Sequence, residues 1–393
     1  IAEAIRAAAH EVAEGKLDGH FVVDVFQTGS GTSTNMNANE VVAGRANEML
    51  TGTRGGKEPV HPNDHVNLGQ SSNDVIPTVI HVAAVSLIVQ RLIPALEKLL
   101  AGLSHKAAEF RNVMKIGRTH LQDAVPVSLG DEFGGYARQV ELGIRRAEKA
   151  TETLSELALG GTAVGSGLNT HPEFAGRVIE LICEKTGCGF REAQNHFEAQ
   201  AAQDSAVEAS GAMKTIAVSL VKIANDVRLM ASGPRCGIGE ISIPSLQPGS
   251  SIMPGKVNPV MPEMVIQVAA QVIGNDAAIT FCGQGGCLEL NTMLPVIAVD
   301  LIESIEILAS AAGLFAEKCV AGLTADLDRC RSYIEQSLAL STYLVPYVGY
   351  DRASEISKEA LLTGKTIREV ARGKAILPEA RLDEIFGDVK SGK

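Results

Sequence analysis

The sequence contains no Trp, and aromatic residues make up only 4% of its 393 residues. Ala, Leu, Val and Ile must therefore fill the core, and these side chains suit closely packed helices. Hydrophobic residues at 45% and charged residues at 21% are typical of a globular chain, which excludes a disordered one. A chain of this length can bury a large core and form two or three domains.

The seven cysteines are odd in number and form no C-x-x-C pair. We therefore expect reduced, buried thiols in a cytoplasmic protein. No uncharged apolar run is as long as a membrane span requires, and no signal peptide is recognisable, so we expect no membrane association. Because the chain opens at Ile1 within a helical pattern, we expect that it begins inside a longer protein.

The net charge is −11 at pH 7, which argues against a nucleic-acid partner. It leaves an anionic substrate open, because salt screens surface charge beyond about 8 Å and one local cation can dominate a pocket.

Helical periodicity dominates the chain. Long helices are predicted over 73–106, from 131 to about 158, and over 201–232, 259–280 and 294–316. Shorter ones are expected over 1–14, 37–49, 326–338, 352–362, 366–371 and 378–386. The sequence shows neither β-α alternation nor a fixed repeat. This pattern predicts an all-α bundle, and its wide apolar stripes predict a homo-oligomer.

Four loops carry clustered small polar residues, over 28–35, 70–74, 117–123 and 249–259. We predict a helix after each, which would turn backbone N–H groups and a positive helix end toward whatever the loops surround. N-capping explains any one loop, since Ser, Thr, Asn and Asp are preferred caps, but one cap needs one side chain and each loop has several. The four together favour a site for a small anion with several oxygens.

The loop over 249–259, GSSIMPGKVNP, is the centre of this pattern. Two hydroxyls, a lysine and an amide fall within nine residues of a loop that Pro254 stiffens and Gly249 and Gly255 free. It is not a phosphate-binding P-loop, because it is one residue too long between its glycines and Val257 stands where Ser or Thr is required.

Three histidines have alternative interpretations. His120 is a candidate general acid or base and equally a satisfied loop histidine, and Glu263 would raise its basicity if the two side chains meet. His61 and His65 have metal-ligand spacing, but Pro62 and the surrounding loop argue against a helical metal pair. We expect no metal and no cofactor.

The loops together resemble the motifs of the fumarase/aspartase superfamily, and most closely those of class II fumarases. The similarity runs from about Asp24 to near the C-terminus. The matching motifs follow the family's order: QTGSGTSTNMNANEV (27–41), HPNDHVNLGQSSND (61–74), GRTHLQDAVP (117–126), GGTAVGSGLN (160–169), KIANDVRLMASGP (222–234) and GSSIMPGKVNP (249–259).

The resemblance implies reversible hydration of fumarate to L-malate through an aci-carboxylate carbanion. By resemblance Ser250 is the base, deprotonated and helped by the amides of its loop, because an unactivated serine is a poor base. Lys256 and Asn258 would hold the substrate carboxylate on which charge builds.

The remaining assignments also follow from the resemblance alone. Thr119 and His120, with Glu263 behind His120, would handle the leaving group and its water. The rest of the dicarboxylate would be bound by Ser30, Thr32, Asn35, Ser71, Ser72, Asn73 and Ser251. A secondary anion site, which is not the catalytic one, would consist of His61, Asn63 and Asp64.

The family fold is all-α with three domains, and it forms a tetramer around a twenty-helix core in which each active site takes loops from three subunits. On this chain the resemblance implies an N-terminal domain over 1–96, incomplete at its start. A central long-helix domain over 97–323 and a small C-terminal domain over 324–393 would follow.

Two other functions stay open. PVMPE (259–263) and TGKTIREV (363–370) are reminiscent of aspartases, which release ammonia from L-aspartate, whereas Ser30, Ser72 and FEAQAAQD (197–204) resemble fumarases. The fumarase-like differences fall on the expected substrate loops and therefore favour water as the leaving group. A non-catalytic structural relative is the third interpretation, against which the retention of Ser250, Lys256, Asn258 and His120 argues.

Overall fold

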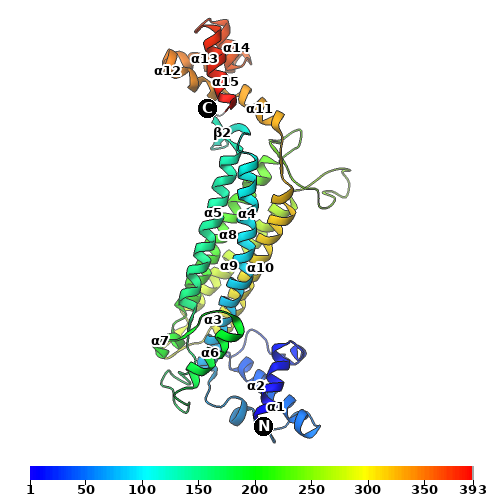
Figure 1. Cartoon of the computed structure of the whole chain (residues 1–393), viewed down its shortest axis with the longest axis vertical. Coiled ribbons are helices and arrows are strands. Elements are labelled where there is room, and N and C mark those ends of the chain that lie inside the picture. The colour runs from blue at the N-terminus through cyan, green and yellow to red at the C-terminus, as the bar shows by residue number, and fades with distance from the viewer. Residues whose placement is uncertain (392–393) are drawn as a thin grey trace. The chain divides into compact units, whose positions relative to one another are not determined.

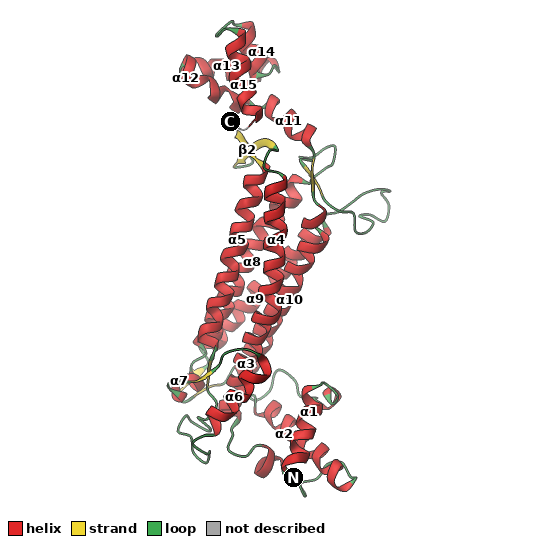
Figure 2. Cartoon of the chain, in the orientation of Figure 1, coloured by secondary structure: helices red, strands yellow, loops and turns green. Residues whose placement is uncertain are grey.

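The computed structural model describes residues 1–391. Within that range it consists of helices, loops and four short two-stranded sheets (Figure 1 and Figure 2). The all-α prediction is thereby confirmed. Long helices form where the apolar period of 3.6 is sustained: Met213, Ile216 and Leu220 of one predicted stripe are each at most 2% exposed.

The chain divides into two compact units. Unit 1 comprises Ile1–Pro94, Gly143–Val218 and Val268–Ser310, and unit 2 comprises Ala95–Leu142, Ser219–Gln267 and the residues from Ala311 onward. Besides α4 (Ile93–Glu109), of which only Ile93 and Pro94 fall in unit 1, four continuous helices contribute residues to both units: α5 (Leu129–Leu154), α8 (Asp204–Met230), α9 (Val260–Gly283) and α10 (Leu294–Lys318).

Unit 1 holds the first two polar loops on a helical frame. Its other helices are α1 (Ala2–Ala13), η1 (Asp18–His20), α2 (Thr32–Thr51), the π-turn η2 (Pro62–Val66), α3 (Ser72–Leu87), the π-turn η3 (Ile88–Leu92), α6 (Phe174–Thr186) and α7 (His196–Ala201). Its strand pairs are β3 (Glu156–Leu157) with β4 (Arg191–Glu192), which is parallel, and β6 (Gly286–Cys287) with β7 (Leu290–Asn291), which is antiparallel.

Polar contacts fix how the long helices pack within unit 1. Ser210 of α8 donates to Asp276 of α9 at 2.9 Å, and Asn275 of α9 donates to Glu303 of α10 at 2.9 Å. Ser210, Asn275 and Asp276 are at most 5% exposed, so these bonds are made where water does not compete. They set the register of three helices whose apolar contacts alone would tolerate sliding.

Unit 2 holds the other two polar loops. It contains α4 (Ile93–Glu109) from Ala95 on, the hairpin β1 (Met114–Thr119) and β2 (Gln122–Ser128), and the antiparallel pair β5 (Ile241–Ser242) and β8 (Thr324–Ala325). Short helices follow: η4 (Val320–Gly322), α11 (Leu327–Gln336), η5 (Leu338–Leu344), α12 (Val345–Val348), α13 (Tyr350–Thr363), α14 (Ile367–Gly373) and α15 (Glu379–Ser391). They enclose a separate apolar cluster that includes Leu344, Ile356 and Phe386.

Two local expectations are wrong. The loop predicted over 117–123 is the end of the β1–β2 hairpin and therefore does not lead directly into a helix. Two of the seven cysteines, Cys236 and Cys287, are exposed, whereas burial raises the pKa of Cys319 and of Cys330 to about 12.

His81 of α3 gives the fold a dependence on pH. Its side chain is 8% exposed, and Nδ1 lies 2.7 Å from the carbonyl oxygen of Glu156, so the neutral ring donates there. Burial lowers the pKa of His81 from its usual 6.5. A lowered histidine pKa means that its contribution to stability is complete above about pH 6.5 and is lost as pH falls toward the folded-state pKa.

Replacing His81 with glutamine is therefore expected to flatten the acid side of the stability profile, because Gln keeps a donor but does not titrate. In the wild type this one group contributes at most about 1.4 kcal/mol per pH unit below pH 6.5. Urea unfolding between pH 5 and pH 7.5 measures the slope. His105→Gln is the matched control, because His105 is 77% exposed at its side chain. An unchanged slope in His81→Gln would contradict the assignment.

Candidate functional site

Unit 1 brings two helix N-termini together at a chain of hydroxyls. Thr32 Oγ1 lies 2.8 Å from Ser30 Oγ and 2.7 Å from Ser72 Oγ, so the first turn of α2 meets the first turn of α3. Ser30 and Ser72 are each 8% exposed. Both helices exceed fifteen residues, and their free N–H groups and positive ends make this junction a place for a carboxylate.

Glycine makes the first of these turns possible. Gly31 precedes α2 with φ 73°, and a Cβ on Gly29 would lie 1.7 Å from the carbonyl oxygen of Thr292. The amide of Leu294 donates to the carbonyl of Gly29 at 3.0 Å. The start of α10 thus holds the turn that carries Ser30 and Thr32.

The side chains of three predicted contact residues of unit 1 form hydrogen bonds within the chain. Ser71 Oγ accepts the amide of Asn73 at 3.2 Å and caps α3, as the capping alternative allowed. Asn73 Nδ2 donates to the carbonyl of Ala163 at 2.8 Å, and Asn35 Nδ2 donates to Asn67 Oδ1 at 3.1 Å. Ser30, Thr32 and Ser72 are therefore the better candidates for a substrate contact within this unit.

Asp74 is a supporting residue that the sequence interpretation missed. Its carboxylate is fully buried and accepts the backbone amides of Ser71 at 2.9 Å and of Gly160 and Thr162 at 3.0 Å each. Burial raises the pKa of Asp74, and the three amides oppose that rise. Asp74 thus ties the glycine-rich loop over 160–169 to the start of α3. The spacing Ser71-x-x-Asp74, which is that of a capping box, is the sequence signal that could have identified Asp74.

His61 is the N-cap of the π-turn η2. Its Nδ1 accepts the amides of Asn63 and Asp64 at 3.2 Å each, and Nδ1 of His65 accepts the amide of His61 at 2.8 Å. Both rings therefore present Nδ1 to the backbone. In residues 1–391, no three His, Cys, Asp or Glu side chains are grouped as a metal site would require.

In unit 2 the loop over 249–259 is closed on itself. The amide of Gly249 donates to the carbonyl of Lys256 at 2.8 Å, and Asn258 Nδ2 donates to the carbonyl of Gly249 at 2.9 Å. A Cβ on Gly249 would lie 2.6 Å from that Lys256 oxygen, so only glycine fits at the closure. The loop borders an open cavity of about 480 Å³ lined by residues 245–250 and 253–257.

Within this loop Ser250 differs from its neighbour. Ser250 Oγ accepts the amides of Ile252 at 3.2 Å and of Met253 at 3.0 Å. Amides directed at one oxygen stabilise negative charge on it, which is what an alkoxide base requires. Ser251 is exposed and, across the part of the chain that the structure describes, makes no side-chain hydrogen bond. Lys256 is exposed as well.

The β1–β2 hairpin presents Thr119 and His120 at its tip, and both are exposed. Leu121, the next residue, lines a cavity of about 500 Å³ with Pro259 and with Asn225, Arg228 and Ser232 of the fifth motif. The tip and the start of α9 therefore border the same cavity of unit 2. Among the described residues, however, His120 and Glu263 share neither a hydrogen bond nor an ion pair, so one chain does not form the predicted pair.

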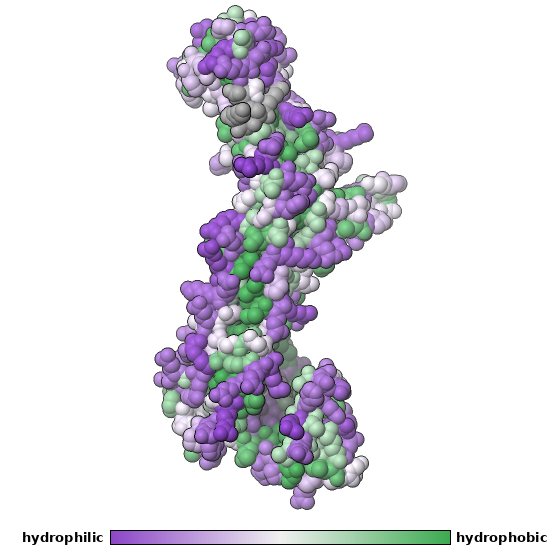
Figure 3. All heavy atoms as spheres, in the orientation of Figure 1, coloured by the Kyte–Doolittle hydropathy of each residue, from purple (hydrophilic) through white to green (hydrophobic). Residues whose placement is uncertain are grey.

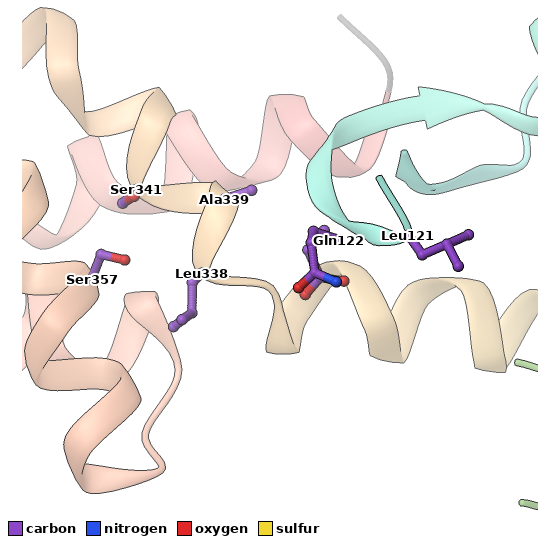
Figure 4. A pocket seen from close by; sticks show the side chains of 7 residues that line it. Leu121, Gln122, Leu338, Ala339, Ser341 and Ser357 are labelled. Atoms are coloured by element: carbon purple, nitrogen blue, oxygen red, sulfur yellow. The ribbon is translucent and has the colours of Figure 1, made fainter. Parts of the chain in front are cut away.

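A second cavity lies on another side of the same tip. It measures about 470 Å³ and is lined by Leu121 and Gln122 of the hairpin tip and by Leu338 and Ala339 of η5, with Gln122 the nearer of the two tip residues to η5 (Figure 4). Asp123, Ser341 and Ser357 complete its lining. None of the predicted site residues lines it, so this cavity is a feature of the hairpin's packing against η5 and α13.

Comparison with known proteins places these features in a family. A family model described as "Lyase" matches residues 1–274, and one described as "Fumarase C C-terminus" matches residues 340–387. The chain is 56% identical to the class II fumarate hydratase of Nitrosomonas europaea, over 94% of this chain and 80% of that protein. It is 51% identical to the mitochondrial fumarate hydratase of Rhizopus oryzae, over 98% of this chain and 78% of that protein.

Solved structures show the same similarity. The class II fumarase of Schistosoma mansoni superposes with a TM-score of 0.93 at 39% identity, covering 98% of this chain and 83% of that one. The fumarate lyase:delta crystallin of Brucella melitensis, bound to cobalt, superposes with a TM-score of 0.92 at 46% identity, covering 99% and 84%.

Proposed function

This chain belongs to the lyase family and, within it, to the class II fumarate hydratases, and from that premise we propose how its residues carry out the reaction. The reaction is the reversible hydration of fumarate to L-malate. The observation that carries the proposed mechanism is the position of Ser250, whose Oγ already accepts two backbone amides of its own loop.

In the dehydration direction Ser250 removes the proton from the carbon next to a carboxylate. That proton is weakly acidic, so the step requires both a strong base and stabilisation of the charge that passes onto the carboxylate. The amides of Ile252 and Met253 stabilise Ser250 as the oxyanion. Lys256 supplies the cation and Asn258 an amide donor for the aci-carboxylate.

The second carboxylate of the substrate binds at the junction of α2 and α3. Ser30, Thr32 and Ser72 supply hydroxyls, and the two helix N-termini supply positive potential. Asn35, Ser71, Asn73 and Ser251 remain proposed contacts of lower rank. The first three bond to backbone groups or to another amide side chain, whereas Ser30, Thr32 and Ser72 bond to one another through hydroxyls that can rotate toward a substrate. The leaving hydroxyl receives a proton that His120 passes through a water held by Thr119 and His120, so that it departs as water and leaves the His120 ring neutral; Glu263 lies behind His120.

His61, Asn63 and Asp64 form the proposed secondary anion site. An anion there would be held by Asn63 and by the Nε2–H of His61, whose Nδ1 accepts backbone amides, beside the start of η2. It takes no part in the chemistry.

The proposed assembly is a homotetramer in which three subunits contribute to each site. Two stretches, Ser72–Glu109 and Val260–Gly283, have the length and composition of membrane spans, which the sequence interpretation did not anticipate, yet only 39% of each apolar window is buried within the chain. Val79, Ile273 and Phe281 are 53%, 40% and 69% exposed. Hydrophobic residues gather along the visible face of the long helices (Figure 3). Apolar faces of this extent are covered by further copies of the chain in the proposed tetramer.

The division into domains over 1–96, 97–323 and 324–393 and the cytoplasmic location are part of the same proposal. Fractionation of the source cell would test the location, because the Rhizopus relative is named mitochondrial.

The absorbance of fumarate, followed with and without ammonium, tests the function. We expect fumarate to be consumed in ammonium-free buffer, with malate as the product. Consumption only in the presence of ammonium would instead establish an aspartate ammonia-lyase and would overturn the weight given to Ser30 and Ser72. A folded protein that consumes fumarate in neither buffer would favour a non-catalytic relative.

A further inference from the structure

The turn that carries His120 has an unusual backbone. His120 has φ 56° and Leu121 has φ 60°, and the two residues join Thr119 to Gln122, which pair across the hairpin. A two-residue hairpin turn with two positive φ angles normally holds Asn and Gly, because other side chains are strained there. This turn therefore requires support from elsewhere in the fold.

The strand β1, which leads into the turn, is irregular next to Arg118, the residue that could give this support. The register of β1 and β2 shifts between Ile116 and Arg118, around Gly117. A Cβ on Gly117 would lie 2.6 Å from the carbonyl oxygen of Val125, so the strands approach closely there. Such a bulge re-aims the following side chain, and the side chain of Arg118 is only 18% exposed.

Arg118 ends on a fully buried carboxylate. Its Nη1 lies 2.9 Å from both Oε1 and Oε2 of Glu240, whose exposure is 0%. Nζ of Lys115, which is 2% exposed, lies 3.4 Å from Glu240 and 3.1 Å from Glu132. Two cations and two carboxylates thus balance beneath the hairpin, in a setting where charged hydrogen bonds are strong and an unmatched charge is costly.

Glu240 is itself immobilised by its backbone. Its amide donates to the carbonyl of Met230 at 2.9 Å, and its carbonyl accepts the amide of Asp326 at 2.9 Å. The ring of Tyr333 lies 5.5 Å from Cζ of Arg118, and its hydroxyl donates to the carbonyl of Ile238 at 3.0 Å. The guanidinium is therefore held by α11 as well as by Glu240.

We propose that Arg118, anchored on Glu240, is a positioning residue. It keeps the strained His120–Leu121 turn in the geometry that protonation of the leaving hydroxyl requires. The inference rests on the proposed role of His120. Arg118 acts through the hairpin and does not contact the substrate.

The test separates positioning from stability. Arg118→Met leaves Glu240 without its main partner, and we expect both the unfolding temperature and kcat to fall, with kcat reduced on the order of tenfold or more. In the double variant Arg118→Met with Glu240→Gln the buried charges balance again, since Lys115 keeps Glu132. We expect the unfolding temperature to recover while kcat stays low and KM for fumarate changes little.

Leu121→Gly provides the rescue. Glycine takes positive φ without strain, so it favours this turn even without the anchor. We expect Leu121→Gly alone to raise the unfolding temperature. Added to the double variant, Leu121→Gly should restore part of the kcat that the double variant has lost. This single variant also keeps the inference testable if Arg118→Met does not fold, because a lowered unfolding temperature in Leu121→Gly would overturn the strained-turn argument.

Two results overturn the inference in distinguishable ways. If kcat returns to the wild-type value together with stability in the double variant, Arg118 is merely structural and the proposed function stands. If the folded wild type does not hydrate fumarate, the proposed function fails and this inference fails with it.

Discussion

Ser250→Ala is expected to lower kcat for malate dehydration by about 10²–10⁴-fold, the usual contribution of a positioned base. The fold should be retained, because within residues 1–391 Ser250 Oγ bonds only to two amides of its own loop. KM should change little, since the carboxylate contacts come from other residues. The rate of fumarate formation, followed by absorbance, and a circular dichroism melt measure the two effects.

The adjacent serine makes this test specific. Ser251→Ala removes a hydroxyl from the same loop, but one without amide donors, so its effect on kcat should be much smaller. A larger loss in Ser251→Ala than in Ser250→Ala would transfer the role of base to Ser251. A Ser250→Ala enzyme with near-wild-type turnover would contradict the serine mechanism although the family assignment would remain.

The long helices were predictable because their signal is local. α10 begins at Leu294 and ends at Lys318, against a prediction of 294–316, since its apolar period is uninterrupted and packing does not override it. α6 and α7 were missed, because helices of thirteen and six residues show too few turns of periodicity to stand out from their polar surroundings.

The hairpin was not predictable from the same local signals. GRTHLQD contains none of the Asn-Gly or Asp-Gly pairs that mark a two-residue turn, and His120 and Leu121 adopt positive φ against their own preference. Next to the turn, Arg118 forms a buried ion pair with Glu240, which is more than a hundred residues away in the sequence. Composition around Thr119 therefore indicated only a polar loop, while the tertiary contacts formed a β-turn.

The polar loops of the site were predictable as a set and less so one by one. A helix was expected after the loops over 28–35 and 70–74, and α2 and α3 begin at Thr32 and Ser72, whose hydroxyls meet; that meeting was not itself predicted. The number of hydroxyls did not show which of the two adjacent serines has which role. Ser71 caps α3, whereas Ser72 contacts Thr32, and both are the same residue type in the same loop. Only the capping-box partner Asp74 distinguishes their positions.

Mixing two inactive variants is expected to restore activity if each active site draws on different subunits. Ser250→Ala and His120→Asn each disable one group, and neither residue is buried. When the two variants are dissociated and reassembled together at equal concentration, random assembly leaves about a quarter of the sites with both native residues. Fumarate hydration should therefore rise far above the sum of the two separate preparations, since sites built from one chain could not recover at all.

The reverse mixture is the matched control. Wild type reassembled with the double variant, Ser250→Ala with His120→Asn, contains the same residues in the same amounts. Shared sites should again retain about a quarter of full activity, whereas sites contained in one chain should retain about a half. A first mixture that stays at the sum of its parts, with a second that stays at one half, would place Ser250 and His120 of one chain in the same site. In that case the separation of His120 from Glu263 within the chain would have to be removed by movement of the hairpin and not by a neighbouring subunit.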